Sequence, residues 1–73
     1  MTVFEAKKVA QQEYKKTVTE DIVNGNSKYI VVDDDSKEAL IVPDEITARN
    51  CGCPWIFKGY VLNGETVINL IES

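Results

Sequence analysis

The sequence predicts a small α+β domain in the order α-β-β-α-β-β, with two β-hairpins that form one antiparallel sheet. Three observations predict it: a stripe of small or apolar residues at helical spacing, two pairs of β-rich segments around polar turns, and Pro43-Asp44-Glu45 between the pairs. A chain of 73 residues has room for one hydrophobic core. We therefore expect residues 1–73 to form a single domain.

The first helix is predicted from Val3 onward, because small or apolar residues recur every three or four positions. The stripe consists of Val3, Ala6, Ala10, Tyr14, Val18 and Ile22. Between its members lie good helix formers, mainly lysine, glutamine and glutamate. A β-branched run at 17–19, which also begins a capping-box pattern, indicates a break near Thr17. The cluster Asn24-Gly25-Asn26-Ser27 is expected to end the element.

The first hairpin is predicted from Lys28–Val32 and Ala39–Val42, which are rich in β-branched and apolar residues. Residues 33–38 between them have the aspartates and the serine that are typical of a turn. Pro43 cannot donate a hydrogen bond to a ladder, so we expect the second strand to stop there. A short helix is then predicted with Pro43 at its first position, and Gly52 is expected to close it.

A second hairpin is predicted in the last third, where Asn63-Gly64 joins residues 55–62 to residues 65–71. Asn-Gly between β-rich segments is the strongest short-range hairpin signal, because both residues tolerate positive φ. One face of the hairpin would carry Phe57, Val61, Ile68 and Leu70, and the other Ile56, Tyr60, Val67 and Ile71. Since both faces are apolar, we expect a helix or a second subunit to cover each. A terminal helix over Glu65–Glu72 is the alternative.

The composition excludes several classes of protein. The longest apolar runs, Tyr29–Val32 and Ala39–Val42, are far shorter than the ~20 residues of a membrane span, so no membrane partner is expected. The first residues lack the basic and apolar regions of a secretory signal, which favours a cytoplasmic location. Without histidine, the chain cannot form histidine-based nucleophile pairs, zinc motifs or general bases. We therefore expect neither an enzyme nor a cofactor.

Cys51-Gly52-Cys53 is one candidate site, because two thiols one residue apart can bind a metal or form a disulfide. Structural zinc has four ligands, usually thiolate or imidazole, and one chain supplies only two such groups. Redox motifs usually place two residues between their cysteines, and a helix C-terminus would raise a thiol pKa. We therefore expect small thiols that pack at a turn, with a thiolate metal-binding or redox module as the alternative.

An acidic cluster in the predicted hairpin loop is the second candidate site; it consists of Asp33, Asp34, Asp35 and Glu38. Residues 26–50 contain six acidic and three basic residues, so most of the net charge of −4 lies in this block. The cluster does not fit an EF-hand, because Lys37 occupies a ligand position. Solvated carboxylates are the simplest interpretation. The functional interpretation is that they mimic nucleic-acid phosphates and bind a basic protein.

Direct nucleic-acid binding is not expected, because acidic residues are in excess and Arg49 is the one arginine in the sequence. Trp55 is a further candidate contact, since tryptophan often anchors protein interfaces. The sequence thus predicts a non-enzymatic protein-binding or regulatory domain, whose partner is another protein and which forms a homodimer through the second hairpin. A structural subunit of a larger assembly is an alternative. A more specific form of the protein-binding hypothesis is an inhibitor that binds a basic protein through Asp33, Asp34, Asp35 and Glu38.

Overall fold

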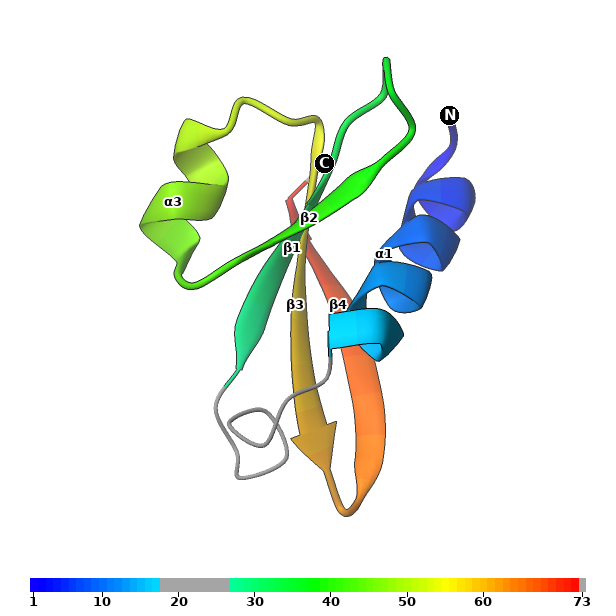
Figure 1. Ribbon diagram of the computed structural model, residues 1–73, viewed down its shortest axis with the longest axis vertical. Coiled ribbons are helices and arrows are strands. Elements are labelled where there is room, and N and C mark those ends of the chain that lie inside the picture. Colours follow the sequence, from blue (N-terminus) through cyan, green and yellow to red (C-terminus); the bar gives the residue numbers. More distant parts are fainter. Residues whose placement is uncertain (18–26, 73) are drawn as a thin grey trace.

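The computed structural model describes residues 1–17 and 27–72, which form two helices and a four-stranded antiparallel sheet (Figure 1). The elements are α1 (Val3–Thr17), β1 (Lys28–Val32), β2 (Ala39–Val42), α3 (Glu45–Asn50), β3 (Trp55–Leu62) and β4 (Glu65–Glu72). The predicted α+β class and element order are confirmed. The terminal-helix alternative is wrong, because residues 65–72 form a strand that pairs with β3.

The strand order is β2-β1-β3-β4, so the two hairpins lie side by side and β1 and β3 are the central strands. Each neighbouring pair is antiparallel. Ile30 pairs with Phe57 across the two hairpins, and both side chains are fully buried. The core of the protein therefore lies where the hairpins meet.

The second hairpin closes through the predicted two-residue turn. Leu62 pairs with Glu65, and φ is 52° at Asn63 and 81° at Gly64, the positive values that a type I′ turn requires. The register places on one face Phe57, Val61, Ile68 and Leu70, as expected. The other face differs from the prediction at one position: the ladder shifts between residues 56 and 57, which leaves Ile71 outside the alternation.

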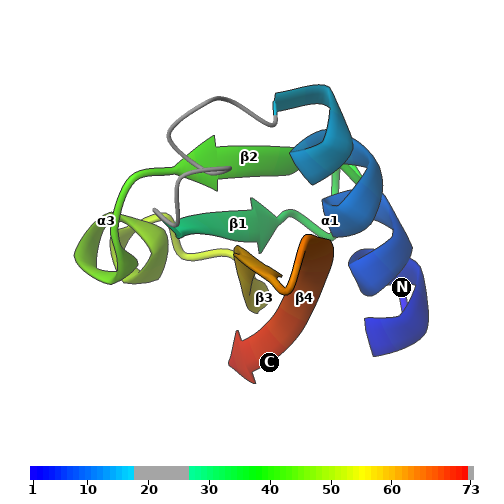
Figure 2. The ribbon, with the colours of Figure 1, turned by 90° about the horizontal axis from the view of Figure 1, so that it is seen from below.

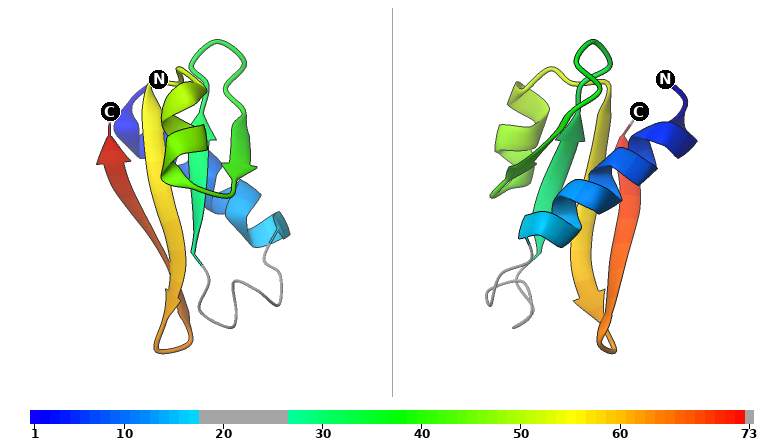
Figure 3. Two further views of the ribbon diagram at one scale, coloured as in Figure 1. Left: turned by 90° about the vertical axis from the view of Figure 1, so that its left-hand side faces the viewer. Right: turned by 45° about the vertical axis from the view of Figure 1, so that its right-hand side comes forward.

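The two helices cover opposite faces of the sheet (Figures 1 and 2). On one face, α1 runs obliquely across the strands (Figure 3) and forms the main core. That core consists of Ala6, Ala10, Tyr14, Ile30, Val32, Phe57 and Ile68. On the other face, α3 packs against β1 and β2, and a smaller cluster consists of Val31, Val42, Ala48 and Ile56. Alternation along β1 supplies both clusters, because neighbouring side chains point to opposite faces.

The start of α1 has a capping box that the sequence analysis missed. Thr2 Oγ1 accepts a hydrogen bond from Glu5 N at 3.2 Å, and the Glu5 carboxylate accepts one from Thr2 N at 3.1 Å. The bond from Thr2 N to the carboxylate, together with one from Thr2 Oγ1 at 3.2 Å, lowers the pKa of Glu5. Val3 was expected on the buried stripe but is exposed, because it lies in the first turn beside the cap. Val18, Ile22 and the predicted end of the helix at 24–26 lie outside the described residues.

The predicted position of Pro43 at the start of α3 is wrong. Asp44 is the N-cap, and its carboxylate accepts a hydrogen bond from Thr47 N at 2.7 Å, which lowers the pKa of Asp44. An aspartate side chain satisfies a free N–H of the first turn, which proline cannot do, so the helix begins after Asp44. At the other end Cys51 is the C-cap, and Gly52 follows with φ 71°, as the expected closing residue.

The Tyr14 ring lies directly on Gly59 in the middle of β3. A Cβ atom at Gly59 would lie 2.6–2.9 Å from three atoms of the ring. The ring is fully buried in the main core. Glycine at this position therefore allows α1 to approach the sheet closely.

Gly59→Ala is expected to lower the free energy of unfolding by about 1–3 kcal/mol, because the added methyl group overpacks the contact with Tyr14. Chemical denaturation monitored by circular dichroism measures the change. Thr66→Ala, at an exposed position of β4, is the control and is expected to change stability little. An unchanged or higher stability of Gly59→Ala would show that the contact does not limit the packing.

The Tyr14 hydroxyl is buried and has no hydrogen-bond partner among the described residues, and burial raises the pKa of the phenol. Tyr14→Phe is therefore expected to keep or raise stability, by up to about 1 kcal/mol, because it removes an unsatisfied polar group.

The raised pKa of Tyr14 also makes stability depend on pH. The folded protein retains the phenol proton at pH values where the unfolded chain loses it, so wild-type stability falls as pH rises above about 10. Chemical denaturation at pH 8 and at pH 10.5 measures the fall in the free energy of unfolding, which should be smaller for Tyr14→Phe than for the wild type. An equal fall in both proteins would contradict the assignment of this pH dependence to Tyr14.

Candidate functional site

The acidic loop, residues 33–38, joins β1 to β2 at one end of the sheet. Its ends are tied together, because Asp33 N donates a hydrogen bond to Glu38 O at 3.0 Å. Lys37 N donates to Asp33 O at 2.9 Å, and Lys37 has a φ of 57°. The backbone of the loop is thus closed by its own hydrogen bonds, so its side chains leave from fixed positions.

The Asp33 carboxylate shapes this loop. It accepts a hydrogen bond from Ser36 Oγ at 3.0 Å and another from Asp35 N at 3.3 Å. These bonds stabilise the charged form, the bond from Ser36 most of all, and they lower the pKa of Asp33. Asp33 is therefore ionised at neutral pH and organises the turn.

The other three acidic residues of the cluster differ in their partners. Asp34 forms an ion pair with the amino group of Met1, at 3.3 Å. Asp35 and Glu38 are exposed, and neither side chain forms a hydrogen bond or an ion pair with another described residue. Asp35 and Glu38 are thus the carboxylates of the loop that can accept bonds from another molecule without losing an existing one.

A hollow of 480 Å³ lies between the acidic loop and the turn after α3; we call it the α3-side hollow. Its lining includes Val31, Asp33, Glu38, Leu40, Cys51 and Cys53. The fold thus brings two members of the acidic cluster, Asp33 and Glu38, to the same hollow as the Cys-Gly-Cys motif, whereas the sequence analysis treated the cluster and the motif as separate sites. The hollow itself was missed, because it depends on which face of the sheet α3 covers.

The two cysteines are free thiols in different surroundings. Cys51 is exposed, whereas Cys53 is half-buried against the smaller core cluster. Burial raises the pKa of the Cys53 thiol, and the neighbouring Cys51 and Asp33 raise it further. A raised pKa lowers the thiolate fraction, so Cys53 is a weak nucleophile at neutral pH. The described residues contain no group of three or more cysteine or acidic side chains placed to hold a metal ion.

Trp55 lies on the opposite side of the sheet from the α3-side hollow. It pairs with Val32 at the start of β3 and packs half-buried against the main core under α1. The structure therefore brings Trp55 to the same end of the sheet as the acidic loop but not into the hollow.

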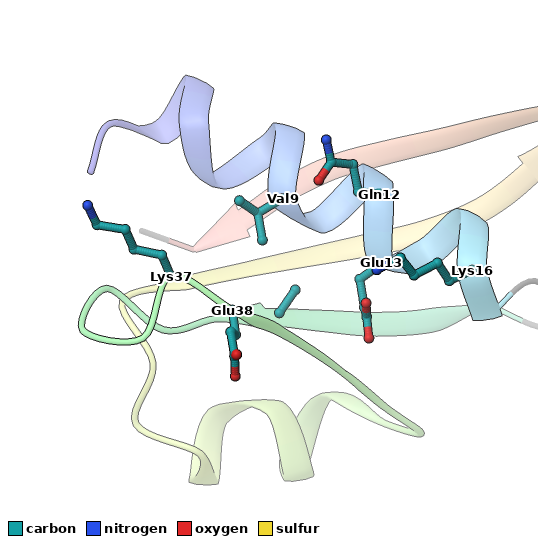
Figure 4. Close-up of a pocket in the computed structure, with 7 residues that line it drawn as sticks. Val9, Gln12, Glu13, Lys16, Lys37 and Glu38 are labelled. Carbon is teal, nitrogen blue, oxygen red and sulfur yellow. The ribbon is translucent and has the colours of Figure 1, made fainter.

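A second hollow, of 430 Å³, lies between α1 and the first hairpin; we call it the α1-side hollow (Figure 4). The charged residues that line it are Glu13, Lys16, Lys37 and Glu38. Two of these side chains are acidic and two are basic. In Figure 4 the Glu38 side chain points away from α1, toward the side of the sheet where α3 lies.

None of the helices in the described part of the chain has the length and apolar character that spanning a membrane requires.

Cys51 is expected to react faster than Cys53 with iodoacetamide at pH 8, because Cys53 is less exposed and its thiol pKa is raised. The variants Cys51→Ser and Cys53→Ser each leave one thiol, whose alkylation rate is measured by mass spectrometry. A several-fold faster rate for the protein that retains Cys51 is the expected result. Equal rates in the folded protein would contradict the difference in surroundings, and equal rates in urea are the control.

Comparison with known proteins adds no relative from which a function could be inferred. No protein-family model, no curated protein and no solved structure matches this chain.

Proposed function

We propose that this chain is a non-enzymatic protein-binding domain that uses the acidic loop to hold a basic, nucleic-acid-binding protein. The observation that carries the proposal is the pair of exposed carboxylates, Asp35 and Glu38, on a loop closed by its own hydrogen bonds. A loop whose backbone is already closed loses little backbone conformational entropy on binding. Lysine and arginine side chains that contact phosphates on DNA or RNA can pair with carboxylates instead.

The distribution of charge supports the acidic loop as the surface that contacts the basic partner. Residues 27–72 contain eight acidic and four basic residues, whereas α1 contains four lysines and two glutamates. The sheet and its loops are therefore acidic, and the exposed face of α1 is basic. A positively charged partner would be steered toward the acidic loop and away from α1.

A homodimer is a further candidate assembly, because α3 leaves part of its side of the sheet open. α3 packs against β1 and β2, and on β3 and β4 the side chains of Tyr60 and Val67 stay half-exposed while Leu62 is exposed. A second copy packed on this surface would bury apolar groups that the monomer leaves in contact with water.

The test is capture of proteins from a lysate of the source cells on the immobilised chain, with identification by mass spectrometry. The double variant Asp35→Asn/Glu38→Gln is expected to capture its basic partner roughly tenfold less well, because two exposed ion pairs are lost. Asp33 is left unchanged, since its carboxylate holds the loop. Capture should weaken as salt is raised.

The matched control is Glu45→Gln/Glu65→Gln, which removes the same charge outside the acidic loop. It is expected to capture the partner as well as the wild type does. Duplex DNA or RNA should displace the chain from the captured protein, since both occupy the same basic surface. Equal loss of capture in both double variants, or capture that nucleic acid does not displace, would contradict the proposal. The native mass of the complex gives the number of copies of this chain.

A further inference from the structure

The α3-side hollow has an apolar base beneath charged groups. Val31 and Leu40 pair across β1 and β2 and lie on the same face of the sheet. Val31 is 2% exposed and Leu40 is 59% exposed, so this surface runs from the core to the solvent. Leu40 is therefore the apolar side chain of this pair that another molecule can reach.

The charged side chains that line this hollow, among the described residues, are Asp33 and Glu38, and both are acidic. The nearby cation of the loop, Lys37, lines the α1-side hollow instead. Arg49 of α3 lies 3.0 Å from the Glu45 carboxylate, with which it forms an ion pair. Both charged side chains that line the α3-side hollow are therefore acidic, whereas the lining of the α1-side hollow also contains Lys16 and Lys37.

The Cys53 thiol does not add to this charge. The raised pKa of Cys53 keeps that thiol protonated at neutral pH, and the lowered pKa of Asp33 keeps its carboxylate ionised. The wall formed by Cys53 is thus uncharged and weakly polar, and the rim is anionic.

We propose that the α3-side hollow binds the side chain of an arginine on the basic partner, an inference that rests on the proposed function above. The aliphatic stem of the arginine lies over Leu40, and its guanidinium group donates hydrogen bonds to the carboxylates of Asp33 and Glu38. A volume of 480 Å³ falls within the range of about 300–1,000 Å³ that is usual for ligand sites.

Arginine fits these surroundings better than lysine does. Its guanidinium group is planar, donates in a fork that can reach two carboxylates, and is more weakly hydrated than an ammonium group. A long side chain with an apolar stem and a charged end also matches a site that is apolar at its base and acidic at its rim.

The test is a titration of the ¹⁵N-labelled full chain with N-acetyl-arginine amide, followed by NMR. Saturable shifts are expected at the amides of Leu40, Gly52 and Cys53, with a dissociation constant on the order of millimolar, as for one side chain. N-acetyl-citrulline amide has nearly the same shape without the charge and is expected to bind at least fivefold more weakly. N-acetyl-lysine amide should also bind more weakly than the arginine compound.

Two variants with matched controls separate the apolar base from the acidic rim. Leu40→Ala should weaken binding of the arginine amide several-fold, whereas Leu62→Ala, at 56% exposure and at the end of β3 beside the Asn63-Gly64 turn, should leave it unchanged. Glu38→Gln should weaken binding and Glu65→Gln should not. Absence of saturable shifts, equal binding of citrulline or lysine, or full binding by Leu40→Ala would overturn the proposal.

The two proposals fail in different ways. If capture depends on Asp35 and Glu38 but the arginine amide does not bind, the hollow is not the arginine site and the acidic loop remains the contact surface. If capture is the same in both double variants, the proposed function fails, whatever the small molecule does.

Discussion

Packing of the Tyr14 ring on Gly59 determines how the first helix lies on the sheet. The other residues that α1 buries in the core are Ala6 and Ala10, which are small and allow close approach. The aromatic ring therefore supplies most of the helix's buried volume, and burial of such a side chain contributes about 1.5–3 kcal/mol. Its unsatisfied hydroxyl offsets part of that gain. With α1 held in this way, the sheet leaves its other face for α3 and for the hollow beside it.

Local patterns in the sequence predict most of the fold. Helical spacing along residues 6–14, β-rich segments and the Asn63-Gly64 turn all depend on neighbours within a few positions, and each is found where expected. The predictions are wrong where two local signals compete for one position, or where pairing with another strand determines the register. The start of α3 is set by Asp44 and not by Pro43, because the Asp44 carboxylate accepts a hydrogen bond from a backbone N–H of the first turn. The irregular register near Ile71 cannot be read from alternation, because it depends on the partner strand.

The candidate site was predictable in its parts but not in its arrangement. The acidic cluster and the cysteine motif are visible in the sequence, yet their meeting in one hollow depends on contacts between segments far apart in the chain. The structural role of Asp33 had a local signal, since aspartate followed three positions later by serine favours a side-chain turn. The Thr2-x-x-Glu5 pattern is likewise a local signal that predicts the capping box. Local signals could not predict which carboxylates of the loop have partners. Asp33 and Asp34 do, whereas Asp35 and Glu38 have none among the described residues.

The two outer strands of the sheet have unequal lengths: β2 has four residues and is followed by Pro43, whereas β4 has eight and contains neither lysine nor proline. A short edge strand is a poor template for a neighbouring chain, whereas a long one without such residues is a good template. Continuous polymerisation of sheets requires one edge to pair with the opposite edge of the next molecule. Two molecules paired through equivalent β4 edges would leave the short β2 edges outermost, and these are poor templates for further pairing.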